Sequence, residues 1–557
     1  MMRYPYISVA LLVLITIGNY FASYSFSLLN PLASYIGQSI ILVTTIGLVL
    51  ALKGSMENKL SYSSFISITY VYIISISSWH IFLTNHSFSP DVNFETTIVE
   101  EITKSGYIGN PQKYYYAAKL YAEFPATELL ASFLSIALNC YPYIIMNYLW
   151  IFIKSILILF LFLFFKRMGM TRPNKEIKYE ETILFSTISS LFVLSSSSSI
   201  YFFSFTIHNL TSLTLLMMTL YFYTRNESRL GMLVVIATLI ISHNATLIVF
   251  IAWMILLLIL KIADHDYNRI IIELSSLTLS IVYFLYISYL NFNNIINTLE
   301  YLIQEPTQLH LQTALTASIS PIKPFYYKIL GLIHVFLLVV GALYGVLLSL
   351  NRRMFPRAFN PWLSLLFFSI IYFIILTFVP LLVGRGLDVL VRARLPLALI
   401  TAVPLTKILA RLLRNGSIWR GVALVVFSLY LIGGFYDLVP PAVYDKHVQY
   451  SMDDPRYSIM LEEQFDVLRY FLLRNDGRPI YSIALGYHYI ASFGISYIPI
   501  TPSSLLDIEN KKSEFVAVFR WDLQKVPDYE GVSVDVNSIL RITDIIFNSK
   551  YLYVVIN

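Results

Sequence analysis

The sequence predicts a polytopic α-helical membrane protein with about thirteen transmembrane helices and a small C-terminal α/β domain outside the membrane. Hydrophobic residues make up 57% of the 557 residues and charged residues only 13%, about half of the roughly 25% typical of soluble domains. The charge is also uneven, because 26 Asp, Glu, Lys and Arg residues lie within 438–557. Residues 1–437 are therefore expected to face lipid, and residues 438–557 to face water.

Apolar runs of roughly 17 to 25 residues, which are long enough to cross about 30 Å of hydrocarbon, place the expected helices in order. They are 5–24, 32–52, 60–84, 142–165, 182–198, 200–223, 269–290, 325–349, 360–383, 394–413 and 419–437. The run 229–262 is long enough for two helices, and it is divided at Ser242–His243–Asn244. The first run has no signal-peptidase cleavage site after it, so it is interpreted as a retained span.

Lysine and arginine residues set the orientation, because cytoplasmic loops retain them. They gather in alternate loops, as at 166–178, 352–357 and 411–420. This pattern predicts a multi-pass plasma-membrane protein with a cytoplasmic N-terminus and an external C-terminal domain. The apolar segment 124–139 breaks the alternation, and at 1.5 Å per residue it reaches only about 24 Å. It is therefore expected to be a re-entrant or interfacial helix on the outer side.

The C-terminal domain, 438–557, begins with a helix-like stretch and continues with short β-rich runs. The helix-like stretch is RYSIMLEEQFDVLRYFLL, and the strand-like runs are PIYSIAL, SYIPI, FVAVFRW and YLYVVI. Helices interleaved with such runs predict a small α/β domain. No glycine-rich phosphate loop occurs there, so no catalysis is assigned to it.

Charge and cysteine content exclude two classes of function. The net charge of +6 arises mostly from short loops beside membrane spans, which argues against nucleic-acid binding. The single cysteine, Cys140, excludes an intramolecular disulfide framework and a cysteine-rich metal site.

The first of three unusual outer loops, 85–121, carries two carboxylates four residues apart, Asp91 and Glu95. A helix that starts near Pro90 would place both on one face. Paired carboxylates at a membrane surface can hold a divalent metal or take a proton from an attacking hydroxyl. The alternative is that they are solvated loop charges, or that Asp91 stabilises the helix start.

Histidines and arginines form the other candidate groups. His208 lies about two turns into its span, and His243 lies at the break described above. A histidine within a span is costly to leave unpaired and usually faces the bundle interior, although a packing role is the alternative. Arg385, Arg392 and Arg394 occur in the third outer loop, 384–394. Guanidinium groups at this depth suit a phosphate or diphosphate, and the alternative is snorkelling to lipid headgroups.

These features together resemble the membrane glycosyltransferases of the C-type superfold (GT-C), which include protein O-mannosyltransferases, aminoarabinose transferases and oligosaccharyltransferases. The resemblance is carried by the acidic first outer loop, the helix start at Phe124–Pro125, the intramembrane histidine, the pair Ser242–His243 and the motif Arg-x₆-Arg-x-Arg-Leu-Pro that begins at Arg385. The resemblance covers roughly residues 60–440. Within the group, the chain looks most like prokaryotic, especially archaeal, members. The second unusual outer loop, 291–324, carries none of these motifs.

The resemblance implies transfer of a sugar from a polyprenyl-phosphate-linked donor to a glycan, lipid or protein acceptor at the external face, as in cell-envelope glycosylation. Asp91 matches the first-loop acid that acts as base or metal ligand. Arg392 or Arg394 matches the late arginine that meets the lipid phosphate. Relatives often have histidines where this chain has Glu95 and Glu128, so the resemblance leaves open both a cluster of carboxylates around Mg²⁺ or Mn²⁺ and an inactive site.

His208, His243 and Arg385 would bind substrate, while Asp91, Glu95 and Glu128 would hold the cation. For the C-terminal domain, which has no glycine-rich phosphate loop, the expected roles are to recognise the acceptor, to cover the outer mouth of the site or to stabilise the fold. Two other classes remain as alternatives: a transporter or flippase for a lipid-linked or anionic substrate, and a noncatalytic subunit of a membrane complex.

Overall fold

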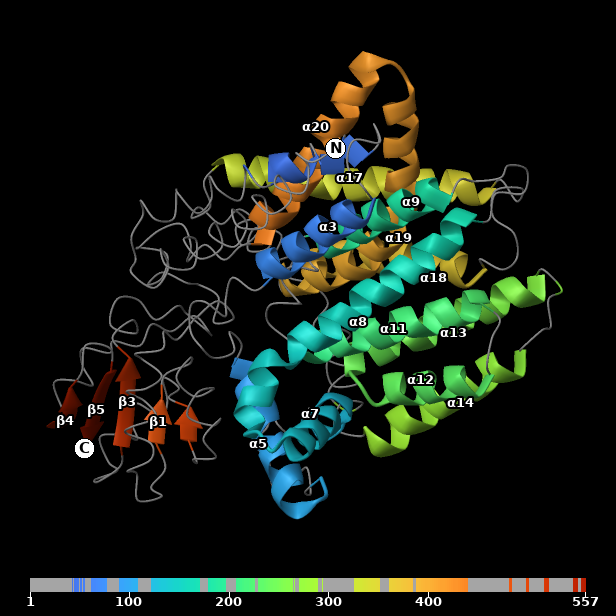
Figure 1. The fold of residues 1–557 in the computed structure, drawn as a ribbon. Helices are drawn as coiled ribbons and strands as arrows, with labels where there is room; N and C mark the ends of the chain where they lie inside the picture. The colour runs from blue at the N-terminus through green and yellow to red at the C-terminus, as the bar shows by residue number, and fades with distance from the viewer. Residues whose placement is uncertain are drawn as a thin grey trace.

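The structure is a computed structural model, and it describes most of the helical body together with five strands of the C-terminal region (Figure 1). The residues described are 43, 45–49, 51–52, 54–55, 62–77, 90–108, 122–170, 179–196, 207–225, 229–263, 265, 270–288, 293, 325–350, 360–383, 387–438, 480–482, 497–499, 515–519, 544–548 and 552–556. The expected first span, 5–24, lies outside these residues, as does most of the second.

The body is a bundle of α-helices whose order follows the apolar runs of the sequence. The helices are α3 (Tyr62–Ser77), α5 (Pro90–Ser105), α7 (Ala126–Leu138), α8 (Pro142–Met170), α9 (Tyr179–Leu194), α11 (Ile207–Arg225), α12 (Arg229–Ile240), α13 (Asn244–Ala263), α14 (Ile270–Val282), α17 (Phe325–Leu350), α18 (Asn360–Val383), α19 (Leu387–Arg414) and α20 (Ser417–Leu438). A π-helical turn, η2 (Tyr283–Ile287), continues α14 without a break. The predicted division of 229–262 is confirmed, because α12 ends at Ile240 and α13 begins at Asn244.

Length and hydropathy confirm a multi-pass membrane protein. Among the residues described, six helices are long and apolar enough to cross a bilayer: Ile144–Met168, Thr246–Ala263, Ile270–Ile287, Ile329–Leu348, Pro396–Leu413 and Ser417–Gly434. Apolar helices of 10–17 residues occur at Ser64–Ile73, Ala126–Leu138, Thr182–Leu194, Gly231–Ile240 and Pro361–Ile371. The total of about thirteen crossings and the orientation remain predictions.

Two helices bury polar side chains and expose apolar ones, which is the reverse of the pattern in a soluble protein. The buried side of α7 carries Glu128, Ser132 and Ser135, whereas Phe133 and Ile136 are 66% and 61% exposed. Helix α14 likewise buries Glu273, Ser276 and Ser280 and exposes apolar side chains. A large apolar outer face is typical of a surface that contacts a membrane or another protein. Helix α7 has 13 residues and reaches only about 20 Å, and its placement as a re-entrant or interfacial helix remains a prediction.

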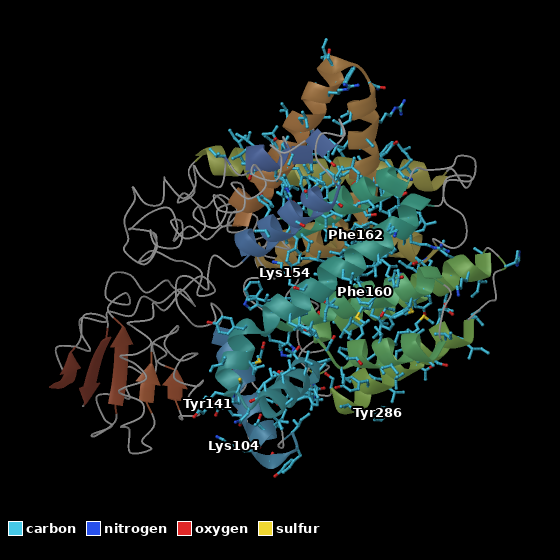
Figure 2. All side chains as sticks on the ribbon, viewed as in Figure 1. Lys104, Tyr141, Lys154, Phe160, Phe162 and Tyr286 are labelled. Atoms are coloured by element: carbon cyan, nitrogen blue, oxygen red, sulfur yellow. The ribbon has the colours of Figure 1, made fainter. Side chains whose placement is uncertain are left out.

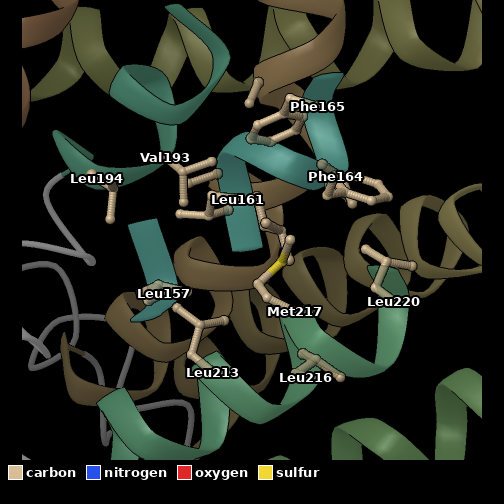
Figure 3. Packing of buried hydrophobic residues seen from close by; sticks show 14 of the residues in the cluster. Leu157, Leu161, Phe164, Phe165, Val193, Leu194, Leu213, Leu216, Met217 and Leu220 are labelled. Atoms are coloured by element: carbon tan, nitrogen blue, oxygen red, sulfur yellow. The ribbon is translucent and has the colours of Figure 1, made fainter. Parts of the chain in front are cut away.

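The core of the body forms where α8 packs between α9 and α11 (Figure 3). Leu157 and Leu161 of α8 and Met217 of α11 are fully buried there. At another contact, the indole nitrogen of Trp253 on α13 donates to the carbonyl oxygen of Pro361 and to Ser364 Oγ, both at 2.9 Å. Because a buried indole N–H must find an acceptor, these bonds fix α13 against α18.

The described part of the C-terminal region is a five-stranded sheet with the order β2-β1-β3-β5-β4. The strands are β1 (Ile480–Ser482), β2 (Tyr497–Pro499), β3 (Phe515–Phe519), β4 (Asp544–Asn548) and β5 (Leu552–Ile556). Strands β1, β2 and β3 pair in parallel, while β5 pairs antiparallel with both β3 and β4. The four predicted β-runs coincide with β1, β2, β3 and β5. The predicted helix of this region lies outside the described residues, so the α/β domain stays a prediction.

Candidate functional site

Three buried polar side chains from three helices meet at the end of the body formed by α5 and α7 (Figure 1). Glu128 lies in the first turn of α7, Glu95 lies in α5, and His208 is the second residue of α11. The Nε2 atom of His208 is 2.7 Å from Glu128 Oε1 and 3.5 Å from Glu95 Oε1, and each side chain is at most 1% exposed. We call these three residues the acid–imidazole cluster.

The break between α12 and α13 orients the imidazole. A helix that ends leaves the carbonyl groups of its last turn without partners in that helix. Here the Ser242 carbonyl accepts a hydrogen bond from Nδ1 of His208 at 3.1 Å, and the Ile241 carbonyl accepts one from the backbone N–H of Ala126 at 3.2 Å. The same break therefore fixes the histidine ring and the start of α7, which carries Glu128.

The hydrogen bonds determine how many protons the acid–imidazole cluster holds. A carbonyl oxygen can only accept, so Nδ1 of His208 carries a hydrogen. The 2.7 Å contact between Nε2 and Glu128 Oε1 also requires a hydrogen between the two atoms. The pair is therefore either an imidazolium with a carboxylate or a neutral imidazole with a carboxylic acid. In both cases the cluster holds one proton more than a neutral histidine beside two carboxylates.

Glu128 has further acceptor capacity on its second oxygen. Its Oε2 atom and the neighbouring Thr127 Oγ1 are buried, and neither has a hydrogen-bond partner within the described ranges. On the other side of the helix turn, Ser132 Oγ bonds to the Glu128 carbonyl at 2.7 Å and to the Val99 carbonyl at 3.3 Å. Helix α7 is thus hydrogen-bonded to α5 one turn beyond the cluster.

The structure confirms the helix expected for the first-loop carboxylates. Helix α5 starts at Pro90, so positions 91 and 95 lie on one face. Glu95 is fully buried, which excludes the interpretation of this residue as a solvated loop charge. The side chain of Asp91 lies outside the described part of the structure, and its role as base or metal ligand remains a prediction.

The structure brings the two histidines together. His208 lies in α11 (Ile207–Arg225), and its expected depth of about two turns into the span 200–223 remains a prediction because the residues before Ile207 lie outside the described part of the structure. Its ring centroid is 6.4 Å from that of His243, which lies just before α13 and is half-buried. Substrate binding by either histidine remains a prediction.

The arginine segment needs a correction. Positions 392 and 394 were expected in an outer loop, but α19 begins at Leu387 and contains both. The reason is that Leu, Ala and Arg favour helix. Positions two apart in a helix differ by about 200° around the axis, so 392 and 394 lie on nearly opposite sides. Arg385 and the side chains of the other two arginines lie outside the described residues.

The acid–imidazole cluster as arranged does not fit a divalent cation. Within the described ranges, no group of three or more His, Cys, Asp and Glu side chains has the geometry of a metal site. The physical reason is that Glu128 Oε1 and His208 Nε2 bond to each other, so these two donor atoms do not converge on a shared ion. A cation at Asp91, Glu95 and Glu128 remains a prediction.

Sequence reasoning missed Glu123 and its partners on η2. Glu123 is 6% exposed, and Ser288 Oγ donates to its Oε2 at 3.0 Å. The hydroxyl of Tyr283 donates to the Glu123 backbone carbonyl. The position of Glu123 just before Phe124–Pro125 was the only signal in the sequence, and a π-helical turn has no recognisable pattern. A buried ion pair between Lys261 and Glu273 was also missed.

Comparison with solved structures finds matches over most of the chain. The apo structure of ArnT from Cupriavidus metallidurans matches with a TM-score of 0.46 and 11% identity, over 88% of this chain and 98% of that one. The same protein bound to undecaprenyl phosphate matches with a TM-score of 0.41 and 10% identity, over 89% and 97%. An Archaeoglobus fulgidus oligosaccharyltransferase, in complex with Zn and sulfate, matches with a TM-score of 0.44 and 13% identity, over 81% and 67%.

No protein-family model and no curated protein sequence matches the chain. The matched structures are GT-C membrane glycosyltransferases, the group that the sequence resembles. Their identities of 10–13% and TM-scores of 0.41–0.46 assign neither a fold nor a reaction to this chain.

Proposed function

We propose that this protein is a membrane glycosyltransferase that moves a sugar from a polyprenyl-phosphate-linked donor to a glycan, lipid or protein acceptor at the external face of the plasma membrane. The observation that carries the proposal is the acid–imidazole cluster. It holds α5, α7 and α11 together through buried charged groups, and α5 carries Asp91 one turn before Glu95.

The burial of the acid–imidazole cluster suggests different roles for the three carboxylates. Glu95 and Glu128 are both fully buried, so neither meets an acceptor hydroxyl in this arrangement. Asp91 is the second residue of α5, one turn before Glu95. We therefore assign the acceptor-facing role to Asp91, and we assign Glu95, Glu128 and His208 to holding α5 at a fixed position.

The proposed reaction is a displacement at the anomeric carbon of the donor sugar. The acceptor oxygen forms a bond to this carbon while the bond from the carbon to the phosphate oxygen breaks, and the phosphate keeps the electron pair. The acceptor proton moves to the carboxylate of Asp91. Negative charge grows on the departing polyprenyl phosphate, and an arginine at 385, 392 or 394 would stabilise it.

The contacts of His208 suit a histidine that balances buried charge. A buried carboxylate without a compensating charge is unstable, and two are present here. The shared proton between His208 and Glu128 offsets one of them. The acids can then remain buried at the contact of α5 and α7, and the position of Asp91 is fixed by rigid helices, as catalysis requires.

The test is sugar transfer by the purified protein in lipid nanodiscs, with a radiolabelled hexose on a polyprenyl phosphate and a membrane extract as the acceptor source. Asp91→Asn should abolish transfer while the folded yield is unchanged. The matched control is Glu100→Gln on the same helix, since Glu100 is exposed and pairs only loosely with Lys104, at 3.5 Å. Full transfer by Asp91→Asn would contradict the proposal. Movement of intact donor across the bilayer of sealed proteoliposomes, without a covalent product, would instead show a transporter.

A further inference from the structure

The segment that leads into α7 is held from two sides. On one side, the Ile241 carbonyl accepts the backbone N–H of Ala126. On the other side, Tyr283 donates its hydroxyl to the Glu123 carbonyl and packs its ring on Phe124, with the ring centroids 5.8 Å apart. The segment from Glu123 to Ala126 therefore has little freedom, and Glu128 follows it by half a turn.

The π-helical turn η2 is what allows two side chains of one helix to reach Glu123. In an α-helix, Tyr283 and Ser288 would differ by about 140° around the axis. Here the N–H of Ser288 bonds to the Tyr283 carbonyl at 3.0 Å, which is the i to i+5 bond that widens a π-turn. The wider turn brings both residues to one side, where Ser288 Oγ reaches the Glu123 carboxylate at 3.0 Å.

A π-turn is rare, and such turns are frequently found at functional sites. Here its residues contact Glu123 and Phe124, which directly precede α7, the helix that carries Glu128. We propose that Tyr283, Ser288 and Glu123 form a positioning clamp, which sets α7 so that Glu128 meets His208. The catalytic part of this inference rests on the proposed function, whereas the mechanical part does not.

The clamp predicts a specific kinetic pattern. Tyr283→Phe removes the hydroxyl that bonds to Glu123 but keeps the ring on Phe124, and Ser288→Ala removes the other bond. A displacement of about 1 Å can cost about 100-fold in rate, so each variant should lower kcat by about 10- to 100-fold with KM unchanged. Glu123→Gln keeps an acceptor oxygen for Ser288 and should retain most of the activity.

Two residues of the same helix provide matched controls. Tyr286 lies in η2 but is 79% exposed, at the edge of the body in Figure 2, so Tyr286→Phe should leave kcat unchanged. Ser280 is buried and bonds to the Ser276 carbonyl of its own helix at 2.7 Å, so Ser280→Ala should do the same. Equal effects of Ser280→Ala and Ser288→Ala, or a normal kcat in both clamp variants, would overturn the clamp.

A second measurement tests the clamp without any assay of transfer. Thermal unfolding in nanodiscs is compared for Ser288→Ala, Glu128→Gln and the double variant. If the clamp sets the contact between Glu128 and His208, Ser288→Ala already weakens that contact. The shift in Tm of the double variant should then be clearly smaller than the sum of the two single shifts. Additive shifts would overturn the clamp, even if the protein proves to be a glycosyltransferase. Non-additive shifts would support it even if no transfer is found.

Discussion

Replacing His208 by alanine should destabilise the protein more than replacing another buried histidine. His208 is 1% exposed and supplies the shared proton to Glu128, with Glu95 also within 3.5 Å. Its removal leaves two carboxylates buried without that proton. Breaking a buried charge pair from one side typically costs about 3–5 kcal/mol, so we expect His208→Ala to lower the free energy of unfolding by that amount.

The control is His334→Ala, which removes a fully buried histidine whose Nδ1 bonds to the Tyr430 carbonyl at 3.1 Å. Loss of a hydrogen bond to a buried backbone group costs about 1–3 kcal/mol, and the lost volume is the same in both variants. Unfolding by SDS in mixed micelles, followed by tryptophan fluorescence, measures both values.

A rescue variant completes this experiment. Glu128→Gln removes one of the two buried charges, so His208→Ala combined with Glu128→Gln should be more stable than His208→Ala alone. If His208→Ala costs no more than His334→Ala, or if the double variant loses the sum of the single effects, the acid–imidazole cluster does not hold the buried charge and proton that we infer.

Three other predictions concern the arginine segment, the orientation and a buried ion pair. Arg392→Lys and Arg394→Lys should differ in their effect on donor binding, because the two positions lie on nearly opposite sides of α19. The variant at the position that faces the donor phosphate should lose about 1.5–3 kcal/mol of binding free energy, measured by titration with the donor. Equal effects, or no effect of either variant, would contradict this. Cysteines at positions 105 and 513 should both react with an impermeant maleimide from outside, whereas protection of one would overturn the topology. Glu273→Gln should cost about 3–5 kcal/mol in the same SDS titration, because it leaves the buried Lys261 without its partner, and a change under 1 kcal/mol would show that the pair is solvated.

The sequence was sufficient to predict the long apolar helices that the structure describes, because hydropathy marks a span directly. The division at Ser242–His243 was also predictable, since three polar residues interrupt a long apolar run. The start of α19 was not, because arginines at the edge of a span have the same pattern in a loop and in a helix. Strand β4 was missed because its sequence, DIIFN, is short and bounded by polar residues.

The acid–imidazole cluster was only partly predictable for a different reason. Glu95, Glu128 and His208 were each identified as candidates, but their pairing joins residues 80 and more positions apart, and no local pattern encodes it. The partner of His208 Nδ1 is a backbone carbonyl, which every residue carries. Glu123 was missed because its contacts with Tyr283 and Ser288 depend on the π-turn at Tyr283–Ile287, and such a turn depends on tertiary packing.

The most direct test of the account is whether the label of a polyprenyl-phosphate-linked hexose becomes covalently attached to an acceptor. Wild-type protein, Asp91→Asn and Glu100→Gln are reconstituted in nanodiscs with the labelled donor and a membrane extract, and the products are separated from free donor. The account predicts a labelled product and released polyprenyl phosphate with wild type and Glu100→Gln, and neither with Asp91→Asn. Equal labelling by Asp91→Asn, or unchanged donor in every sample while the donor still binds, would contradict it.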